Sequence, residues 1–346
     1  MAVTLSEIAK TLGLSIPAVS HVLNPGKSST VVSESTRQRV LEAAQRMSYR
    51  PNAAARSLKS RSFRSIGLLV AGDAERFFLP QDVIVGISRT LAPHRYSCVL
   101  VSAGKLDEET IDDQQMLNEY CVDALMVGYA DDPPPALVNS VRKSGVPTVW
   151  LFRRFPSNCI VYDELGAAAL LTEHLAGLGH REITYLDLNG QGRSAPHIRD
   201  RLDGFHATSG RLSLQAKERL DQRVPREHRA AFAREMLSSR RRPRAIITDT
   251  CSAAAAIIGT ALQMGLKVPR DLAVASFDNG SISSISSPTI TAAITPERRL
   301  GIAAAEMAMQ LIEAKTLGTP ALPPALLSYE LRVGGSTVAP LSRRVE

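Results

Sequence analysis

Basic side chains concentrate at the start of the chain, where they could bind a polyanion. Residues 1–65 carry ten lysines and arginines against three glutamates, whereas residues 66–346 carry 31 basic and 31 acidic side chains. Neutralising phosphates with lysine and arginine releases counterions, which supplies much of the affinity for nucleic acid. The alternative is a solvated basic tail, which fits poorly because this segment is strongly patterned. The first fifth of the chain therefore predicts a nucleic-acid-binding module.

Motifs for catalysis or metal binding are not found in the sequence. His174 and His180 are six residues apart and would not share a helix face. The segment 280–287 is rich in serine but lacks the pattern of a phosphate-binding loop. No nucleophile, base and orienting group can be assembled, so we expect no catalytic residues, no metal site and no cofactor. The run 240–244 is interpreted as an exposed turn, with a second polyanion contact as the alternative.

Length and composition are ordinary for a globular chain. Its 346 residues are 44% hydrophobic and 22% charged, which suggests two or three domains. The N-terminus MAVTLSEIAK is neither a signal nor a transit peptide, and no apolar run approaches the roughly 18–20 residues of a membrane span. The four cysteines lack metal-ligand spacing, which favours buried thiols in a reducing cytosol. We expect a cytoplasmic protein that does not bind a membrane.

Three short helices are predicted within the basic segment. The first begins at a capping box formed by Thr4 and Glu7. Gly13 allows a tight turn, Ser15 can cap a second helix, and a third helix follows Ser33. A helix, a tight turn and a second helix with a small, polar exposed face form the helix-turn-helix arrangement, which places the second helix in the major groove of DNA.

From residue 66 onward, apolar runs alternate with amphipathic segments of helical period. This alternation predicts parallel, doubly wound sheets covered by helices on both faces. About 280 residues of this pattern exceed one core, so we expect two lobes with a ligand cleft beyond the carboxyl ends of the strands. The predicted strands are 66–70, 98–101, 124–127, 148–151, 183–186, 245–248 and 272–277. The predicted helices lie near 81–92, 108–119, 135–144, 165–178, 198–209, 227–239, 251–264 and 297–313.

Seven motifs follow one another along the chain. They are VTLSEIAKTLGLSIPAVSHVLN (3–24), VSESTRQRVLEAAQRMSYRPNAAARSLKS (32–60), IGLLV (66–70), LAGLGHREITYL (175–186), RLDGF (201–205), VPRDLAVASFDN (268–279) and SPTITA (287–292). In order and spacing they resemble the lactose-repressor/galactose-repressor (LacI/GalR) family of bacterial transcription regulators. The resemblance implies a homodimer with a small all-α helix-turn-helix DNA-binding domain. It also implies an α/β periplasmic-binding-protein-like body of two doubly wound parallel-sheet lobes, joined by three crossover strands.

The resemblance places the recognition helix at residues 15–23, with Ile16, Pro17 and His21 facing the groove. His21 stands where an arginine is common, and imidazole offers one donor or one acceptor, so the base it contacts could differ. A phosphate contact is the alternative for His21. The hydroxyls of Thr4, Ser15 and Ser20 suit phosphate positioning, although Ser15 can equally act as a cap. Further DNA contacts are expected at Asn24, Lys27, Tyr49, Asn52 and Ala55.

Residues 52–59 resemble the hinge helix of the family. Three consecutive alanines favour a helix, but one this short is marginal alone, so it should fold only when two copies pack together on DNA. Leu58 matches the leucine that relatives insert between base pairs in the minor groove. The alternative is a plain linker with Leu58 in a small interface.

The resemblance also implies an effector site in the cleft. Arg201 matches an effector-anchoring arginine, and Asp278 matches an aspartate that accepts sugar hydroxyls. A structural arginine–aspartate network is the alternative for both. Asp249 stands where asparagine is usual and Phe152 where aspartate is common. Phe77, Phe78 and Tyr162 are expected at the rim or wall of the cleft, with a core role as the alternative for any one phenylalanine. A sugar or sugar derivative is the expected effector, with a phosphorylated, acidic or non-sugar metabolite as alternatives.

These expectations define domains and a function. We expect a DNA-binding domain, a hinge helix with its linker, and a core of two lobes, each lobe built from two stretches of chain. Their bounds are 1–51, 52–65 and 66–340, with lobe one at about 66–162 and 295–322 and lobe two at about 163–294 and 323–340. The predicted function is a dimeric repressor whose affinity for a pseudo-palindromic double-stranded DNA operator is controlled by a small-molecule effector. The alternatives are a small-molecule binding protein and a sugar-metabolising enzyme that retain a vestigial DNA-binding module.

Overall fold

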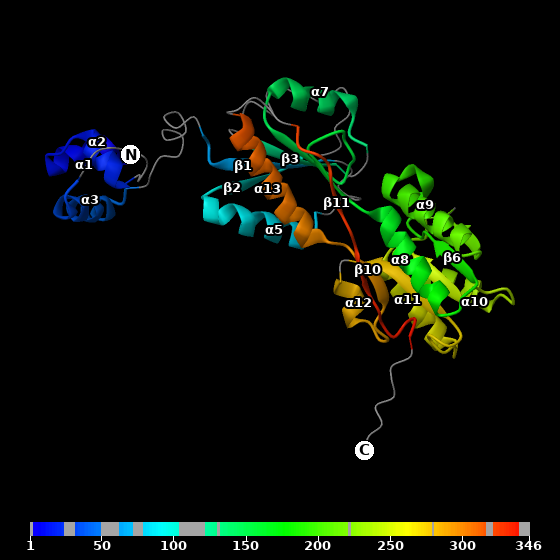
Figure 1. The fold of residues 1–346 in the computed structure, drawn as a ribbon. Coiled ribbons are helices and arrows are strands. Elements are labelled where there is room, and N and C mark those ends of the chain that lie inside the picture. The colour runs from blue at the N-terminus through cyan, green and yellow to red at the C-terminus, as the bar shows by residue number, and fades with distance from the viewer. Residues whose placement is uncertain are drawn as a thin grey trace, which may run out of the picture. The chain divides into compact units, whose positions relative to one another are not determined.

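The chain folds as two compact units, Met1–Phe63 and Arg64–Glu346, in the computed structural model (Figure 1). The structure describes residues 3–23, 32–49, 62–71, 79–103, 122–129, 132–220, 223–278, 280–315 and 321–338. The predictions for Asn24, Lys27, Asn52, Ala55, Leu58, Phe77 and Phe78, and for the helix near 108–119, lie outside these residues. None of the described helices has both the length and the apolar character that crossing a membrane requires.

The first unit contains the three predicted helices, α1 (Leu5–Leu12), α2 (Ile16–Leu23) and α3 (Glu34–Arg46). The predicted capping box is confirmed: the Glu7 N–H donates to the Thr4 hydroxyl, and the Thr4 N–H donates to the Glu7 carboxylate at 2.7 Å. Gly13 ends α1 with a φ of 64°, in the left-handed region that glycine adopts without strain. The Thr36 N–H donates to the Ser33 hydroxyl, which caps α3. The local signals in the sequence therefore set these helix starts.

One small core holds the three helices together. Ile8 of α1, Val19 of α2 and Val40 of α3 are fully buried against one another. The Arg39 guanidinium of α3 also donates to the carbonyl of Leu12 at 3.3 Å, which ties α3 to the end of α1. Because all three helices contribute to the core, the exposed face of α2 is held in a defined orientation within this unit.

The second unit begins with a parallel sheet in the order β11-β5-β4-β3-β1-β2. Helices α5 (Gln81–Leu91) and α13 (Glu297–Lys315) cover one face, and α7 (Pro135–Ser144) covers the other (Figure 1). The strands are β1 (Ser65–Ala71), β2 (Ser97–Ala103), β3 (Ala124–Tyr129), β4 (Thr148–Leu151), β5 (Cys159–Tyr162) and β11 (Ala325–Leu327). The strand order changes direction at β1, where ligands of such sheets usually bind beyond the carboxyl ends.

A second sheet follows in the order β12-β10-β9-β8-β6-β7, parallel except for the β10–β12 pair. One face packs on α8 (Glu164–Gly177) and α9 (Pro196–Arg211), and the other on α10 (Arg229–Ser238), α11 (Cys251–Gln263) and the short α12 (Ser281–Ile285). The strands are β6 (Glu182–Leu186), β7 (Gln215–Arg219), β8 (Ala245–Thr248), β9 (Ala273–Asp278), β10 (Thr291–Ile294) and β12 (Glu330–Arg332).

Each predicted strand has an observed counterpart, and the strands that were missed have physical causes of two kinds. Strands β5, β10, β11 and β12 have only three or four residues, too few for a clear period. Strand β7 has the sequence QAKER at an exposed sheet edge, where burial imposes no apolar pattern. The predicted boundary of lobe two at residue 323 also differs from the structure, because β11 still pairs in the first sheet.

Candidate functional site

The amino end of α2 presents the predicted groove-facing side chains. Ser15, Ile16 and Pro17 are exposed, and 48% of the Ile16 surface is accessible although the side chain is apolar. The Ala18 N–H lies 3.4 Å from the Ser15 hydroxyl, so the capping role of Ser15 is present. Exposed side chains at the start of a recognition helix are those that reach base edges in the major groove.

The other predicted DNA contacts that the structure describes lie at the start of α1, in the last turn of α2 and after α3. Thr4 is exposed at the cap of α1, and Ser20 is half-buried. His21 is also half-buried, and its Nδ1 atom is buried without a hydrogen-bond partner among the described residues. Tyr49 packs against the helical core. The structure thus exposes Thr4, Ser15, Ile16 and Pro17, whereas Ser20 and His21 are half-buried and Tyr49 also has a packing role.

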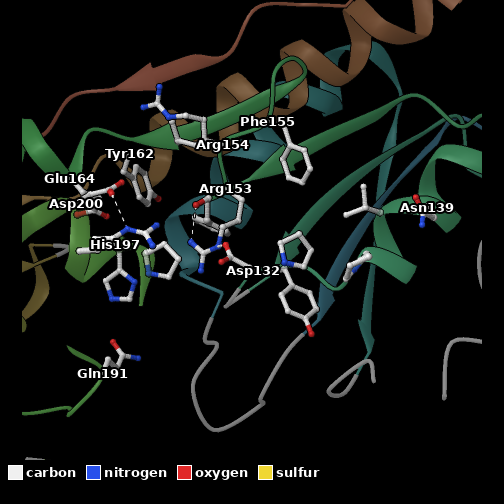
Figure 2. Close-up of a pocket in the computed structure, with 18 of the residues that line it drawn as sticks. Asp132, Asn139, Arg153, Arg154, Phe155, Tyr162, Glu164, Gln191, His197 and Asp200 are labelled. Carbon is white, nitrogen blue, oxygen red and sulfur yellow. Dashed lines mark hydrogen bonds and ion pairs between the residues drawn. The ribbon is translucent and has the colours of Figure 1, made fainter. Parts of the chain in front are cut away.

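A cavity of about 770 Å³ lies between the two sheets of the second unit. Tyr129, Phe152 and Tyr162 line it from the carboxyl ends of β3, β4 and β5, and α7, α8 and α9 supply further walls. Figure 2 shows Asp132 beside Arg153. His197 and Gln191 lie on the wall contributed by the second lobe, which is the part of the second unit built on the second sheet. A cavity of this size, lined from several strand ends, can enclose a small metabolite.

Phe152 and Tyr162 form an aromatic wall of this cavity. Phe152 follows β4 with a φ of 67°, a backbone conformation that bulky residues rarely adopt and that is concentrated at functional sites. Its ring centroid lies 5.8 Å from that of Tyr162. The Tyr162 hydroxyl is buried and has no hydrogen-bond partner within the described part of the chain. An apolar wall with one unused hydroxyl suits a ligand that carries both apolar faces and polar groups.

Arg201 lies behind the cavity and not in its wall. The buried guanidinium donates from Nε to the Glu164 carboxylate at 2.6 Å and from Nη1 to the carbonyl of Asp249 at 3.2 Å. Its Cζ atom also lies 3.9 Å from the centre of the Phe277 ring. Glu164 does line the cavity, so Arg201 reaches the site through this carboxylate.

The two predicted aspartates accept hydrogen bonds from nearby backbone and side-chain amide groups. Asp249 follows β8 and is buried, and burial together with nearby Asp187 raises the pKa of its carboxyl to about 7. The Asn189 side-chain amide donates to Asp249. Asp278 accepts from the N–H groups of Gly280 at 3.0 Å and Ser283 at 2.9 Å. Neither aspartate is among the cavity-lining residues, and Arg201 pairs with Glu164 rather than with an aspartate side chain.

His197 is a cavity residue that the sequence did not single out. Burial, with smaller contributions from Arg201 and Arg153, lowers the pKa of His197 to about 3. It is therefore a neutral hydrogen-bonding group at neutral pH. The only sequence signal was its place after Pro196 at the start of α9, where no side chain caps the helix. No group of three or more potential metal ligands lies close together within the described segments.

Known proteins resemble both units of this chain. The model of bacterial regulatory proteins, lacI family, matches residues 4–52, and that of the periplasmic binding protein-like domain matches residues 172–337. The HTH-type transcriptional repressor PurR of Photobacterium profundum is 30% identical over 318 residues, which cover 90% of this chain and 92% of that protein. The chain belongs to the LacI family of bacterial regulatory proteins.

A further relative and a solved structure match nearly the whole chain. The ribose operon repressor of Escherichia coli is 28% identical over 319 residues, covering 91% of this chain and 94% of that protein. The lac repressor dimer bound to operator and the anti-inducer ONPF matches with a TM-score of 0.79 and 25% identity, covering 98% of this chain and all of that one. The predicted fold is confirmed, and this LacI-family chain is a DNA-binding transcriptional regulator with a ligand-binding domain.

Proposed function

We propose that this LacI-family protein is a homodimeric repressor that binds a pseudo-palindromic DNA operator. A small molecule in the cleft would lower or raise its affinity for that operator. The observation that carries the proposal is a helix-turn-helix unit and a 770 Å³ inter-lobe cavity in one chain. The dimeric state is supported by the operator-bound lac repressor, which is a dimer. Acting on chromosomal DNA, the repressor would work in the cytoplasm and without catalysis.

The DNA-binding surface is proposed to be the amino end of α2 with flanking hydroxyl groups. Ile16 and Pro17 would make apolar contacts to base edges, and His21 would contribute one hydrogen bond in the groove. Thr4, Ser15 and Ser20 would position phosphates, joined by Asn24, Lys27, Tyr49, Asn52 and Ala55. Leu58 is proposed to enter the minor groove at the centre of the operator when two hinge segments meet.

The effector site is proposed to be the cavity between the lobes. Phe152 and Tyr162 supply the apolar wall, with Phe78 as a further proposed wall residue, while Glu164, Gln191 and His197 supply polar groups. Arg201 would hold Glu164 in position, and Asp249 and Asp278 would hold the strand ends that surround the site. An effector changes operator affinity only if it binds one arrangement of the lobes more tightly than the other.

Two measurements test this function. Selection of duplexes from a random pool with the full chain should yield one inverted-repeat sequence. A thermal-shift screen of sugars and sugar derivatives should then find a compound that changes affinity for that duplex. A protein that binds small molecules but enriches no duplex would instead support the binding-protein alternative and contradict the proposal.

A further inference from the structure

A second cavity of about 750 Å³ adjoins the first on the second lobe. The two cavities share Asp132, Gln191 and Pro196 as lining residues. Three arginines line the second cavity, namely Arg223, Arg226 and Arg229. Asp132 is the one carboxylate among its described lining residues, and it lies 3.7 Å from the Arg153 guanidinium of the first cavity. The second cavity therefore carries an excess of positive charge.

Arg229 is a buried cation held by neutral groups alone. Only 4% of its surface is accessible, and its three hydrogen-bond acceptors are the Val224 carbonyl at 3.4 Å, the Ser252 hydroxyl at 2.8 Å and the Asn189 side-chain carbonyl at 2.7 Å. Burial lowers its pKa, while the carboxylates of Asp249 and Asp187 lie too far away for an ion pair and oppose this effect from a distance. A guanidinium has five N–H donors, so two are unused by the described residues. A desolvated charge of this kind is stabilised by an anion.

The loop opposite Arg229 is fixed in place. The Asp187 carboxylate accepts from the N–H groups of Asn189 and Gly192, both at 2.8 Å. Gly190 has a φ of 65°, and a Cβ atom there would lie 2.5 Å from the backbone nitrogen of Arg223. Glycine thus lets this loop approach the segment that carries Arg223 and Arg226. Those two arginines are exposed and have no partner within the described part of the chain.

We propose that the second cavity binds an anionic group of the effector, a phosphate or a carboxylate, through Arg223, Arg226 and Arg229. The proposal rests on the cleft being the effector site and adds the chemical class of the effector. The neutral part of the effector would occupy the first cavity against Phe152 and Tyr162. Its anionic group would extend past Gln191 into the second cavity. Guanidinium groups bind both anions through paired N–H donors, so either source fits the arginines.

The first test uses inorganic phosphate as the probe on the full-length protein. Isothermal titration at constant ionic strength, with chloride as the reference anion, should show saturable phosphate binding. Arg223→Gln and Arg226→Gln should each weaken it about tenfold, the loss expected for one charge-assisted contact. Arg240→Gln is the matched control, because Arg240 is exposed on the same lobe and lines none of the described cavities. Equal binding by all four proteins, or no binding, would overturn the proposal.

The second test identifies the source of the anion. Thermal shifts with glucose, glucose 6-phosphate and gluconate, and with ribose and ribose 5-phosphate, compare each neutral sugar with its anionic relatives. A larger shift with a phosphorylated or an acidic compound, reduced in Arg223→Gln, supports the phosphate or the carboxylate source respectively. A neutral sugar that binds best and equally to both proteins would contradict the inference.

The outcomes separate this inference from the proposed function. If the protein selects an operator but its anion binding does not depend on Arg223 and Arg226, the proposed function stands and the anionic subsite is refuted. If the protein binds phosphate through these arginines but enriches no duplex, the anionic subsite stands and the repressor function is refuted.

Discussion

At the scale of single residues, the second lobe is notable for charged groups that are buried beside its ligand cleft. Asp249 shares its surroundings with Asp187, and the raised pKa of about 7 means that the folded protein retains a proton on Asp249 that the unfolded chain has lost. The ordinary carboxyl pKa is 3.8, so this contribution to stability is complete at low pH and disappears as pH rises from about 4 to 7.

Asp249→Asn tests this linkage, because the amide imitates the protonated acid. We expect the variant to unfold at a higher temperature than the parent at about pH 8, with the difference shrinking towards pH 4. His197, whose lowered pKa of about 3 adds stability as pH rises towards 6.5, is present in both proteins and does not affect their difference. The unfolding temperatures of both proteins between pH 4 and pH 8 measure this difference. A variant less stable than the parent at high pH would show that Asp249 is ionised in the folded state.

The ion pair of Arg201 and Glu164 supports a second prediction. Glu164→Leu leaves a buried guanidinium without its carboxylate and should cost about 3–5 kcal/mol in the free energy of unfolding. The double variant Glu164→Leu, Arg201→Met should recover most of that loss, since it removes both charges and keeps an apolar contact with Phe277. Urea unfolding of the parent, both single variants and the double variant gives the coupling. Losses that simply add would contradict a direct interaction.

At the scale of elements, helices α5 and α13 pack unusually closely. A Cβ atom at Gly301 of α13 would lie 2.1 Å from the Val83 carbonyl, and one at Gly86 of α5 would lie 2.4 Å from the Arg298 carbonyl. Both contacts involve backbone atoms, which cannot rotate away. This crossing covers one face of the first sheet.

Gly301→Ala should therefore destabilise the protein by about 1–3 kcal/mol, the usual cost of overpacking. Gly259→Ala in α11 is the control, because no atom lies within 4 Å of a Cβ there. Alanine is the better helix former, so the control should gain about 0.5–1 kcal/mol. Denaturant unfolding of both variants and the parent measures these changes in the free energy of unfolding. A Gly301→Ala variant more stable than the parent would contradict the close packing.

The elements also show what the sequence could predict. Thr4 and Ser33 act within one helical turn, so their caps were visible in the sequence, and buried runs such as residues 124–127 predicted β3. The cleft was less predictable because it depends on distant pairs. Arg201 was predicted to bind the effector directly, but its partner Glu164 lies 37 residues earlier, and only the fold brings them together. His197 was missed because its place in the cavity wall depends on residues that are distant in the sequence.

At the scale of the whole molecule, the distribution of charge separates the two tasks of the chain. Residues 1–65 carry the excess of basic side chains, and the remaining residues are neutral in sum. Within the neutral core, arginines are nevertheless gathered at the cleft. The first unit is thus suited to a polyanion and the second to a small ligand, and a repressor requires that the second control the first.

The most direct test of this account is the affinity of the full chain for its selected duplex, measured by fluorescence anisotropy over a range of salt concentrations. We expect tight binding that weakens steeply with salt, a much weaker affinity for a scrambled duplex, and a shift in affinity when a cleft ligand is added. Equal affinity for selected and scrambled duplexes, unchanged by any compound that stabilises the core, would contradict this account.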